Sequence, residues 1–196
     1  MTRDVRLEFT RRAPETIEAD IVVVGFFLED RPLRGAAGRL DWRLCGQLSE
    51  FMSSGWLEGR LGSAALLPGS GPIAAMRVLL LGLGTRREFT LERAREVMHD
   101  AVGRCLALGA QSVALSPLGI APDDFARHSE VLIEGLSQAV REAIPDQNEE
   151  DMSDLVLRIS LGEKQLHDAN QVLPSLIASC ADPRISLSGE GVPPSP

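Results

Sequence analysis

Short apolar runs that alternate with amphipathic helical patterns constrain the fold of this chain most. Residues 21–24 form a wholly apolar, β-branched run before Gly25, which is typical of a strand that is covered on both faces of a sheet. Residues 76–81 have the strongest strand pattern in the chain. We therefore predict a central strand at residues 21–24 and a further strand at residues 76–81.

Weaker patterns complete the predicted domain. Residues 5–10 alternate between apolar and polar side chains, which is typical of a half-buried strand at a sheet edge. Further strands are predicted at residues 64–67, 112–116 and 155–161. Helices are predicted at residues 40–52, with Gly55 as the terminator, at residues 90–109, with Thr90 as the cap, and from Pro122 to Pro145. This alternation predicts an α/β fold of three layers, with a mixed central sheet flanked by helices.

The C-terminal part of the chain has a different pattern. Apolar residues recur near helical spacing from Glu163 onward, and Pro174 is predicted to break this stretch into two short helices. The closing residues, SLSGEGVPPSP, have the composition of a disordered tail. We therefore expect a main domain at residues 1–162, a helical segment at residues 163–184 and a disordered tail at residues 185–196.

Length and charge narrow the classes of function. The 196 residues suit one well-buried domain, and the net charge of -8 disfavours binding to nucleic acid. No run approaches the length of a membrane span, and the start lacks the apolar core of a signal peptide, so we expect a cytoplasmic protein without a membrane partner. The three cysteines fit neither a disulfide framework nor the paired spacing of a zinc site.

No short motif in the sequence indicates catalysis. Gly82-Leu83-Gly84 follows a strand, but a dinucleotide fingerprint would need a third glycine where Arg87 stands, so we interpret the motif as a tight turn. The three histidines are far apart and lack metal-ligand spacing, and no Gly-x-Ser-x-Gly motif occurs. We therefore predict no catalytic residue, no cofactor and no metal site.

An ordered set of segments resembles the N-terminal domain of the leucyl aminopeptidase family. The set comprises Leu40-Asp41, Leu57-Glu58-Gly59-Arg60, the strand leading into Gly82-Leu83-Gly84, Glu134-Gly135-Leu136 and the strand at residues 155–161. The resemblance covers residues 5 to 180 approximately, and it implies a macro-domain-like fold. In that family a C-terminal domain supplies the catalytic lysine, the carboxylates and two zinc ions, with the signature Asn-Thr-Asp-Ala-Glu-Gly-Arg. This sequence contains no such run, so the resemblance implies a non-catalytic protein.

Two functional hypotheses follow from this resemblance. The first is a protein-interaction, assembly or regulatory module that acts as an oligomer or with a protein partner. Its apolar helical stripe either folds back onto its own sheet or forms the contact surface, and the surface residues would be Leu166, Leu173, Leu176 and Ile177.

The alternative is a small-molecule module that keeps a macro-type cleft for ADP-ribose or a nucleotide, with Gly25, Gly119 and Ile120 in its ligand loops. Ligand-binding macro domains usually place an asparagine pair where this chain has Gly-Phe-Phe-Leu-Glu-Asp after residues 21–24. The sequence therefore favours the interaction module, and a small-molecule ligand is the less favoured expectation.

Overall fold

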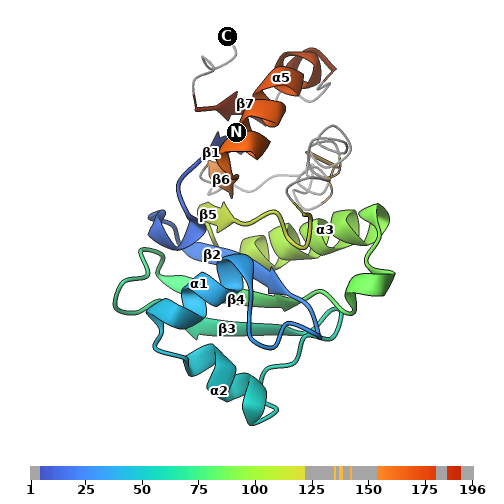
Figure 1. The fold of residues 1–196 in the computed structure, drawn as a ribbon. Coiled ribbons are helices and arrows are strands. Elements are labelled where there is room, and N and C mark those ends of the chain that lie inside the picture. The colour runs from blue at the N-terminus through green and yellow to red at the C-terminus, as the bar shows by residue number, and fades with distance from the viewer. Residues whose placement is uncertain are drawn as a thin grey trace.

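One seven-stranded sheet organises the domain (Figure 1). The computed structural model describes residues 5–121, 135, 137–138, 142, 154–179 and 185–190, so most of the helix predicted at 122–145 lies outside the described residues. The strands are β1 (Val5–Thr10), β2 (Ile21–Phe26), β3 (Ala64–Pro68), β4 (Arg77–Gly82), β5 (Ser112–Leu115), β6 (Leu155–Ser160) and β7 (Ile185–Gly189). Their order is β3-β4-β2-β5-β6-β1-β7, and only the β3–β4 pair is antiparallel. The predicted mixed sheet is confirmed.

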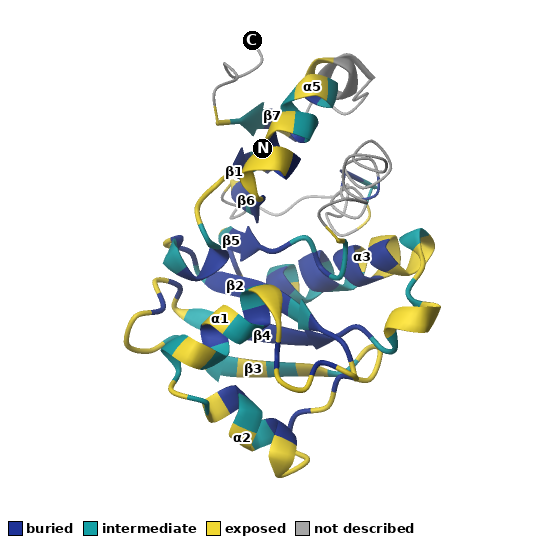
Figure 2. Cartoon of the chain, in the orientation of Figure 1, coloured by how far each residue is buried: buried dark blue, intermediate teal, exposed yellow. Residues whose placement is uncertain are grey.

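Helices cover both faces of this sheet. Helices α3 (Leu91–Ala107) and α5 (Glu163–Ser179) pack on one face, and α1 (Gly35–Arg43) and α2 (Gln47–Ser53) pack on the other. Strand β2 contributes Ile21 and Val23 to the first core and Val22 and Val24 to the second. Alternating side chains of one strand thus enter two different cores, which explains its uninterrupted apolar sequence. Figure 2 shows β2, β4 and β5 buried between these layers, whereas the edge strand β3 is partly exposed and the helices expose their outer faces.

The edge of the sheet differs from the prediction for β1. Residues 5–10 form a strand as predicted, but this strand lies inside the sheet because β7 pairs with it in parallel, from Val5 opposite Ile185 to Phe9 opposite Gly189. The segment expected to begin a disordered tail is therefore a strand at residues 185–189. Its buried Ile185 and Leu187 join the core on the α5 face, a contribution that a composition rich in serine and glycine does not reveal.

The helix predicted at residues 40–52 is two helices. Cys45 and Gly46 adopt positive φ angles of 54° and 86°, which ends α1 and starts α2 in a new direction. The carboxylate of Asp41 accepts hydrogen bonds from the amide and hydroxyl of Ser49 at 3.0 and 2.5 Å, and so links the two helices. The helix after Thr90 is as predicted: the Thr90 hydroxyl caps the Arg93 amide at 3.3 Å, and Gly109 follows with a φ of 71°.

Helix α5 runs through Pro174 without the predicted break. Pro174 is exposed, whereas Leu166, Ala169 and Leu173 are buried against the sheet. A proline on the solvent side of a helix removes one backbone donor, and packing of the opposite face offsets that cost.

Candidate functional site

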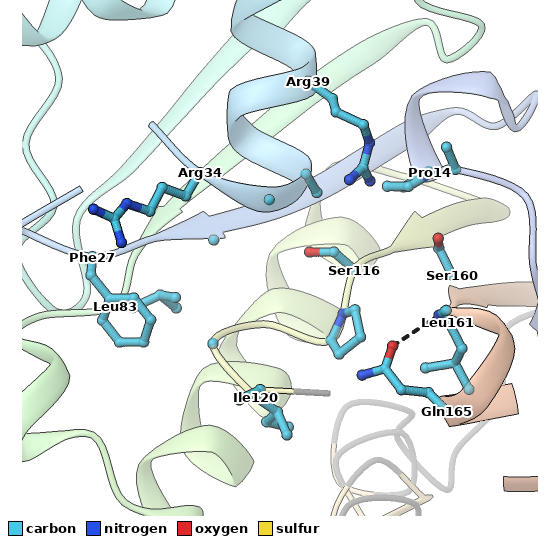
Figure 3. Close-up of a pocket in the computed structure, with 18 of the residues that line it drawn as sticks. Pro14, Phe27, Arg34, Arg39, Leu83, Ser116, Ile120, Ser160, Leu161 and Gln165 are labelled. Carbon is cyan, nitrogen blue, oxygen red and sulfur yellow. Dashed lines mark hydrogen bonds between the residues drawn. The ribbon is translucent and has the colours of Figure 1, made fainter. Parts of the chain in front are cut away.

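A cleft of about 580 Å³ opens where parallel strands of the sheet end. Strand β5 pairs in parallel with β2 and with β6, and β6 pairs in parallel with β1. The carboxyl ends of these strands and the loops that follow them therefore meet at one edge of the sheet. Ligands of open α/β sheets bind at such edges. The lining consists of Arg11, Ala13, Pro14, Gly25, Phe27, Asp30, Arg34, Gly35, Ala36, Arg39, Leu83, Arg86, Ser116, Pro117, Gly119, Ile120, Ala121, Ser160, Leu161, Gly162 and Gln165 (Figure 3).

The three ligand-loop residues named from the sequence, Gly25, Gly119 and Ile120, all line this cleft. A Cβ atom at Gly25 would lie 2.8 Å from the Leu83 side chain, so a larger residue there would require Leu83 to shift. Gly119 has a φ of 81°, and a Cβ atom at this position would lie 2.7 Å from the ring of Phe89. Close approach thus disfavours a side chain at both positions, and the left-handed backbone adds to this preference for glycine at Gly119.

The first turn of α1 opens into the cleft through Arg34, Gly35 and Ala36. The amide of Gly38 is the first in this helix with a backbone partner, the carbonyl of Arg34 at 3.0 Å. No side chain caps this end and its first turn contains no acidic residue. Within the described residues, the amides of Gly35, Ala36 and Gly119 have no hydrogen-bond partner. These donors, together with the helix dipole, favour an anion.

Four arginines line the cleft, and three of them are already paired. Arg39 donates to buried Glu15 at 2.9 Å, Arg86 pairs with Asp30 at 2.5 Å, and Arg11 pairs with Glu190 at 3.1 Å. Arg86 also lies over the ring of Phe27, with its guanidinium carbon 4.2 Å from the ring centroid. Among the described residues Arg34 has no ion-pair or hydrogen-bond partner for its guanidinium, and Figure 3 shows it beside the start of α1. Arg34 is therefore the cation available to a ligand.

Glu190 pairs with Arg11, one of the residues that line the cleft. Its carboxylate accepts hydrogen bonds from the hydroxyl of Thr10 at 2.6 Å and from the amide of Arg11 at 3.2 Å. The Thr10 hydroxyl, with Arg11, holds the pKa of Glu190 below its usual range. Arg11 is thus neutralised by an ionised partner.

The wall opposite Arg34 is polar but uncharged. Ser116 follows β5, Ser160 ends β6, and Gln165 lies in the first turn of α5. The Gln165 side-chain oxygen accepts the amide hydrogen of Gly162 at 2.8 Å, shown as a dashed line in Figure 3.

Sequence reasoning missed Arg34, Gly35, Ser116, Ser160 and Gln165 as site residues. Two signals were present: a polar residue follows an apolar strand at both Leu115-Ser116 and Ile159-Ser160, and a small-residue run begins at Gly35. The order of strands in the sheet was needed to bring these segments together.

The predicted interaction residues have different outcomes. Leu166 and Leu173 are 4% and 0% exposed and belong to the core, so for these two the fold-back alternative holds and the contact-surface expectation is wrong. The side chains of Leu176 and Ile177 lie outside the described residues. Large exposed apolar side chains occur elsewhere, at Trp42, Trp56 and Met76.

Other candidate chemistry is limited within the described ranges. No group of three or more metal-ligating side chains occurs there, and no helix of that part is long and apolar enough to cross a membrane. His99 lies 3.1 Å from Glu142 on exposed helix surface, and His167 contacts Gln171 at 3.0 Å. Cys45 is exposed; Cys105 is buried, which raises the pKa of its thiol to about 12. A thiol protonated at neutral pH is a poor nucleophile.

The sheet order and the cleft place this protein among the macrodomain-like folds. Similar solved structures include a Trypanosoma brucei macrodomain in complex with ADP-ribose, with a TM-score of 0.63, 13% identity and coverage of 84% of this chain and 68% of that one. A tomato leucine aminopeptidase mutant has a TM-score of 0.63 at 14% identity, covering 87% of this chain and 36% of that chain. At such identities the likeness concerns the fold.

The chain belongs to the cytosol aminopeptidase family, and residues 23–141 match the family's N-terminal domain. A probable cytosol aminopeptidase of Nitrosococcus oceani is 31% identical over 133 residues, which cover 67% of this chain and 26% of that protein. A probable cytosol aminopeptidase of Xanthomonas oryzae is 37% identical over 114 residues, which cover 57% of this chain and 23% of that protein. The matched region spans about a quarter of the length of these relatives.

Proposed function

We propose that the cleft binds a small anionic ligand of the nucleotide class, with ADP-ribose as the first candidate. The observation that carries this proposal is the unpaired guanidinium of Arg34 beside the uncapped first turn of α1. Four arginines line the cleft, and because the carboxylates of Glu15, Asp30 and Glu190 pair with three of them, Arg34 supplies the unpaired positive charge. Anions are the ligands that such an arrangement of cations and free amides attracts.

The arrangement of donors narrows the ligand to a phosphate-bearing molecule. Gly35 and Ala36 begin α1, Gly119 follows β5, the neighbour of β2, and all three residues line the cleft. A tetrahedral anion with several oxygens can accept hydrogen bonds from more than one segment at once. Support from related folds comes from the Trypanosoma brucei macrodomain, which was solved with ADP-ribose.

Calorimetric titration with inorganic phosphate and with ADP-ribose tests this proposal. Wild-type protein should bind both saturably, and Arg34→Ala should weaken each by at least about tenfold, because a charge-assisted hydrogen bond contributes roughly 1.5–3 kcal/mol. Arg87→Ala is the matched control, since Arg87 is exposed and does not line the cleft. Absence of binding by wild type, or equal loss in both variants, would overturn the proposal.

We further propose that this chain has no aminopeptidase activity of its own. Its family match lies in the N-terminal domain, whereas two-metal hydrolysis requires carboxylates that bridge a pair of ions. Leucine p-nitroanilide with added zinc or manganese should not be turned over. Chelator-sensitive turnover that follows the protein through a sizing column would contradict this. The names of the relatives, cytosol aminopeptidases, support a cytoplasmic location.

A protein-interaction role is the second candidate, because large indole side chains face solvent on the α1–α2 side. Trp42 is 82% exposed and Trp56 is 58% exposed. Exposed tryptophans are enriched in protein interfaces. Light scattering should then show an oligomer that Trp42→Ser or Trp56→Ser weakens; a monomeric wild type that captures no partner would exclude this role.

A further inference from the structure

Strand β3 forms an edge of the sheet, at the opposite end of the strand order from β7 (Figure 1). In the described part of the chain its only neighbour is β4. Leu66, the middle residue of the strand, is 42% exposed, and exposed residues alternate with half-buried ones along β3 (Figure 2). The outer side of this strand is therefore open to another chain.

The antiparallel ladder fixes which backbone groups of β3 point outward. The Gly82 amide donates to the Ser63 carbonyl at 2.9 Å, directly before the β3–β4 register begins. Because bonded and non-bonded pairs alternate in such a ladder, the odd-numbered residues of β3 bond to β4. Ala64 and Leu66 thus point an amide and a carbonyl outward, and Pro68 points a carbonyl outward. Within the described residues these groups have no partner.

This edge is neutral, although the chain as a whole is acidic. Residues 61–76 contain no charged side chain, whereas the net charge of the chain is -8. Charges near the start of β3 neutralise each other, since Arg60 pairs with Glu58 at 2.9 Å and Arg104 pairs with Asp100 at 2.7 Å. Edge strands that stay unpaired are normally protected by charged side chains, which β3 lacks. Two copies of an acidic chain can therefore meet here without like charges in contact.

We propose that β3 pairs with β3 of a second copy of this chain, antiparallel about a two-fold axis at Leu66, so that the two sheets join edge to edge. The outward groups are self-complementary in this register. The two Leu66 residues exchange amide–carbonyl bonds, and each Ala64 amide donates to the Pro68 carbonyl of the other copy. The Leu66 side chains, exposed in the single chain, lie on the same face and cover each other.

The size of this contact predicts a weak dimer. A single short strand buries less surface than a stable complex needs, so we expect a dissociation constant on the order of 100 µM. The contact is independent of the anion site, because no residue of β3 lines the cleft. Phosphate affinity should therefore be the same in the monomer and in the dimer.

Sedimentation equilibrium of the full chain, from about 10 µM to about 1 mM, tests the pairing. Leu66→Lys places like charges opposite each other and should weaken the dimer at least about tenfold. Ala64→Pro removes an outward amide without removing a bond to β4, and should also weaken the dimer about tenfold. Leu28→Lys is the charge-matched control, since Leu28 is 40% exposed and lies outside β3, and it should stay within about twofold of wild type.

Salt gives a second readout that identifies the partner as a like-charged copy. Because each copy has a net charge of -8, screening should strengthen the dimer. The dissociation constant should fall at least about threefold between about 0.05 and 0.5 M salt. A complex that depends on opposite charges would weaken instead, and that result would overturn the proposal.

Two further results would overturn the β3 pairing. One is a wild type that stays monomeric at the highest concentration; the other is a dimer that neither Leu66→Lys nor Ala64→Pro weakens. A dimer that Trp42→Ser or Trp56→Ser dissociates, with Leu66→Lys unchanged, belongs to the α1–α2 side and likewise overturns it. Thermal unfolding of dilute samples shows whether each variant is folded, and Leu66→Lys decides alone if Ala64→Pro is not. Absence of phosphate binding would leave this inference standing.

Discussion

Helices α1 and α5 both begin at the cleft, from opposite faces of the sheet, and their first turns differ. The first turn of α1 has no acidic residue and no side-chain cap, and Arg34 stands unpaired beside it. The first turn of α5 contains Glu163, and Gln165 already satisfies the Gly162 amide. Both ends have the same backbone dipole. Side chains therefore decide which helix end is available to an anion.

Beyond their first turns, α1 and α5 should contribute to the stability of the fold to a similar extent. Leu40 in α1 and Leu173 in α5 are both fully buried. We predict that Leu40→Ala and Leu173→Ala each lower the free energy of unfolding by about 2–5 kcal/mol, because each leaves a cavity in a packed core. Leu66→Ala on exposed β3 should cost less than about 1 kcal/mol. Urea unfolding measures all three, and a small effect at Leu173 would contradict the packing of α5 as described.

A negative charge should distinguish the two helix ends. Ala36→Asp, in the first turn of α1, should weaken phosphate binding by at least about tenfold, because repulsion between nearby like charges exceeds the roughly 1.4 kcal/mol that this factor requires. Glu163→Ala, which removes the corresponding charge from α5, should change the phosphate affinity by less than about twofold. Calorimetry on both variants makes the comparison. The reverse ranking would place the anion at α5.

Gly119 tests the part of the anion site that belongs to neither helix. Gly119→Ala should destabilise the fold by about 1–2 kcal/mol, since its φ is 81° and the new methyl group meets Phe89. Gly103→Ala, inside α3 with open space around it, should instead stabilise by about 0.5–1 kcal/mol. Thermal unfolding gives both values. Similar changes at the two glycines would mean that the loop after β5 lacks the described conformation.

The smallest effect on stability is expected at Asp20, which precedes β2 at the end of the sheet away from the cleft. This effect should depend on pH. Burial disfavours the charge of Asp20, but hydrogen bonds from the amides of Gln111 and Ser112 at 2.8 and 2.9 Å outweigh it and lower the pKa below its ordinary value of 3.8. The stabilisation is therefore complete above that value and is lost as pH falls through the lower, folded-state pKa.

Asp20→Asn should then reduce stability at neutral pH by about 1 kcal/mol and approach wild type in acid. Urea unfolding at both pH values checks this. A difference that persists unchanged in strong acid would contradict an ionised Asp20.

The sequence revealed the secondary structure more fully than the site. Periodicity located six of the strands because each has an apolar face or is wholly apolar, as at residues 21–24. It missed β7, whose composition is polar, and the break at Cys45-Gly46, where the apolar spacing continues across the turn. Local sequence patterns show neither which strands pair nor that a cysteine adopts a left-handed backbone conformation.

For the site, the glycines at 25 and 119 could be predicted because they stand in the loops that the resemblance to macro domains places at a cleft. Arg34 and Ser160 could not, since arginine and serine are common on any surface. Only the order of strands shows that residues so distant in sequence line one cleft.

Amide NMR during titration with inorganic phosphate shows whether the start of α1 and Gly119 bind an anion. We predict saturable shifts of the Gly35, Ala36 and Gly119 amides, little change at Gly162 and Gln165, and loss of these shifts in Arg34→Ala. Shifts that centre on the start of α5, or none at phosphate concentrations that saturate a macrodomain control, would contradict this prediction.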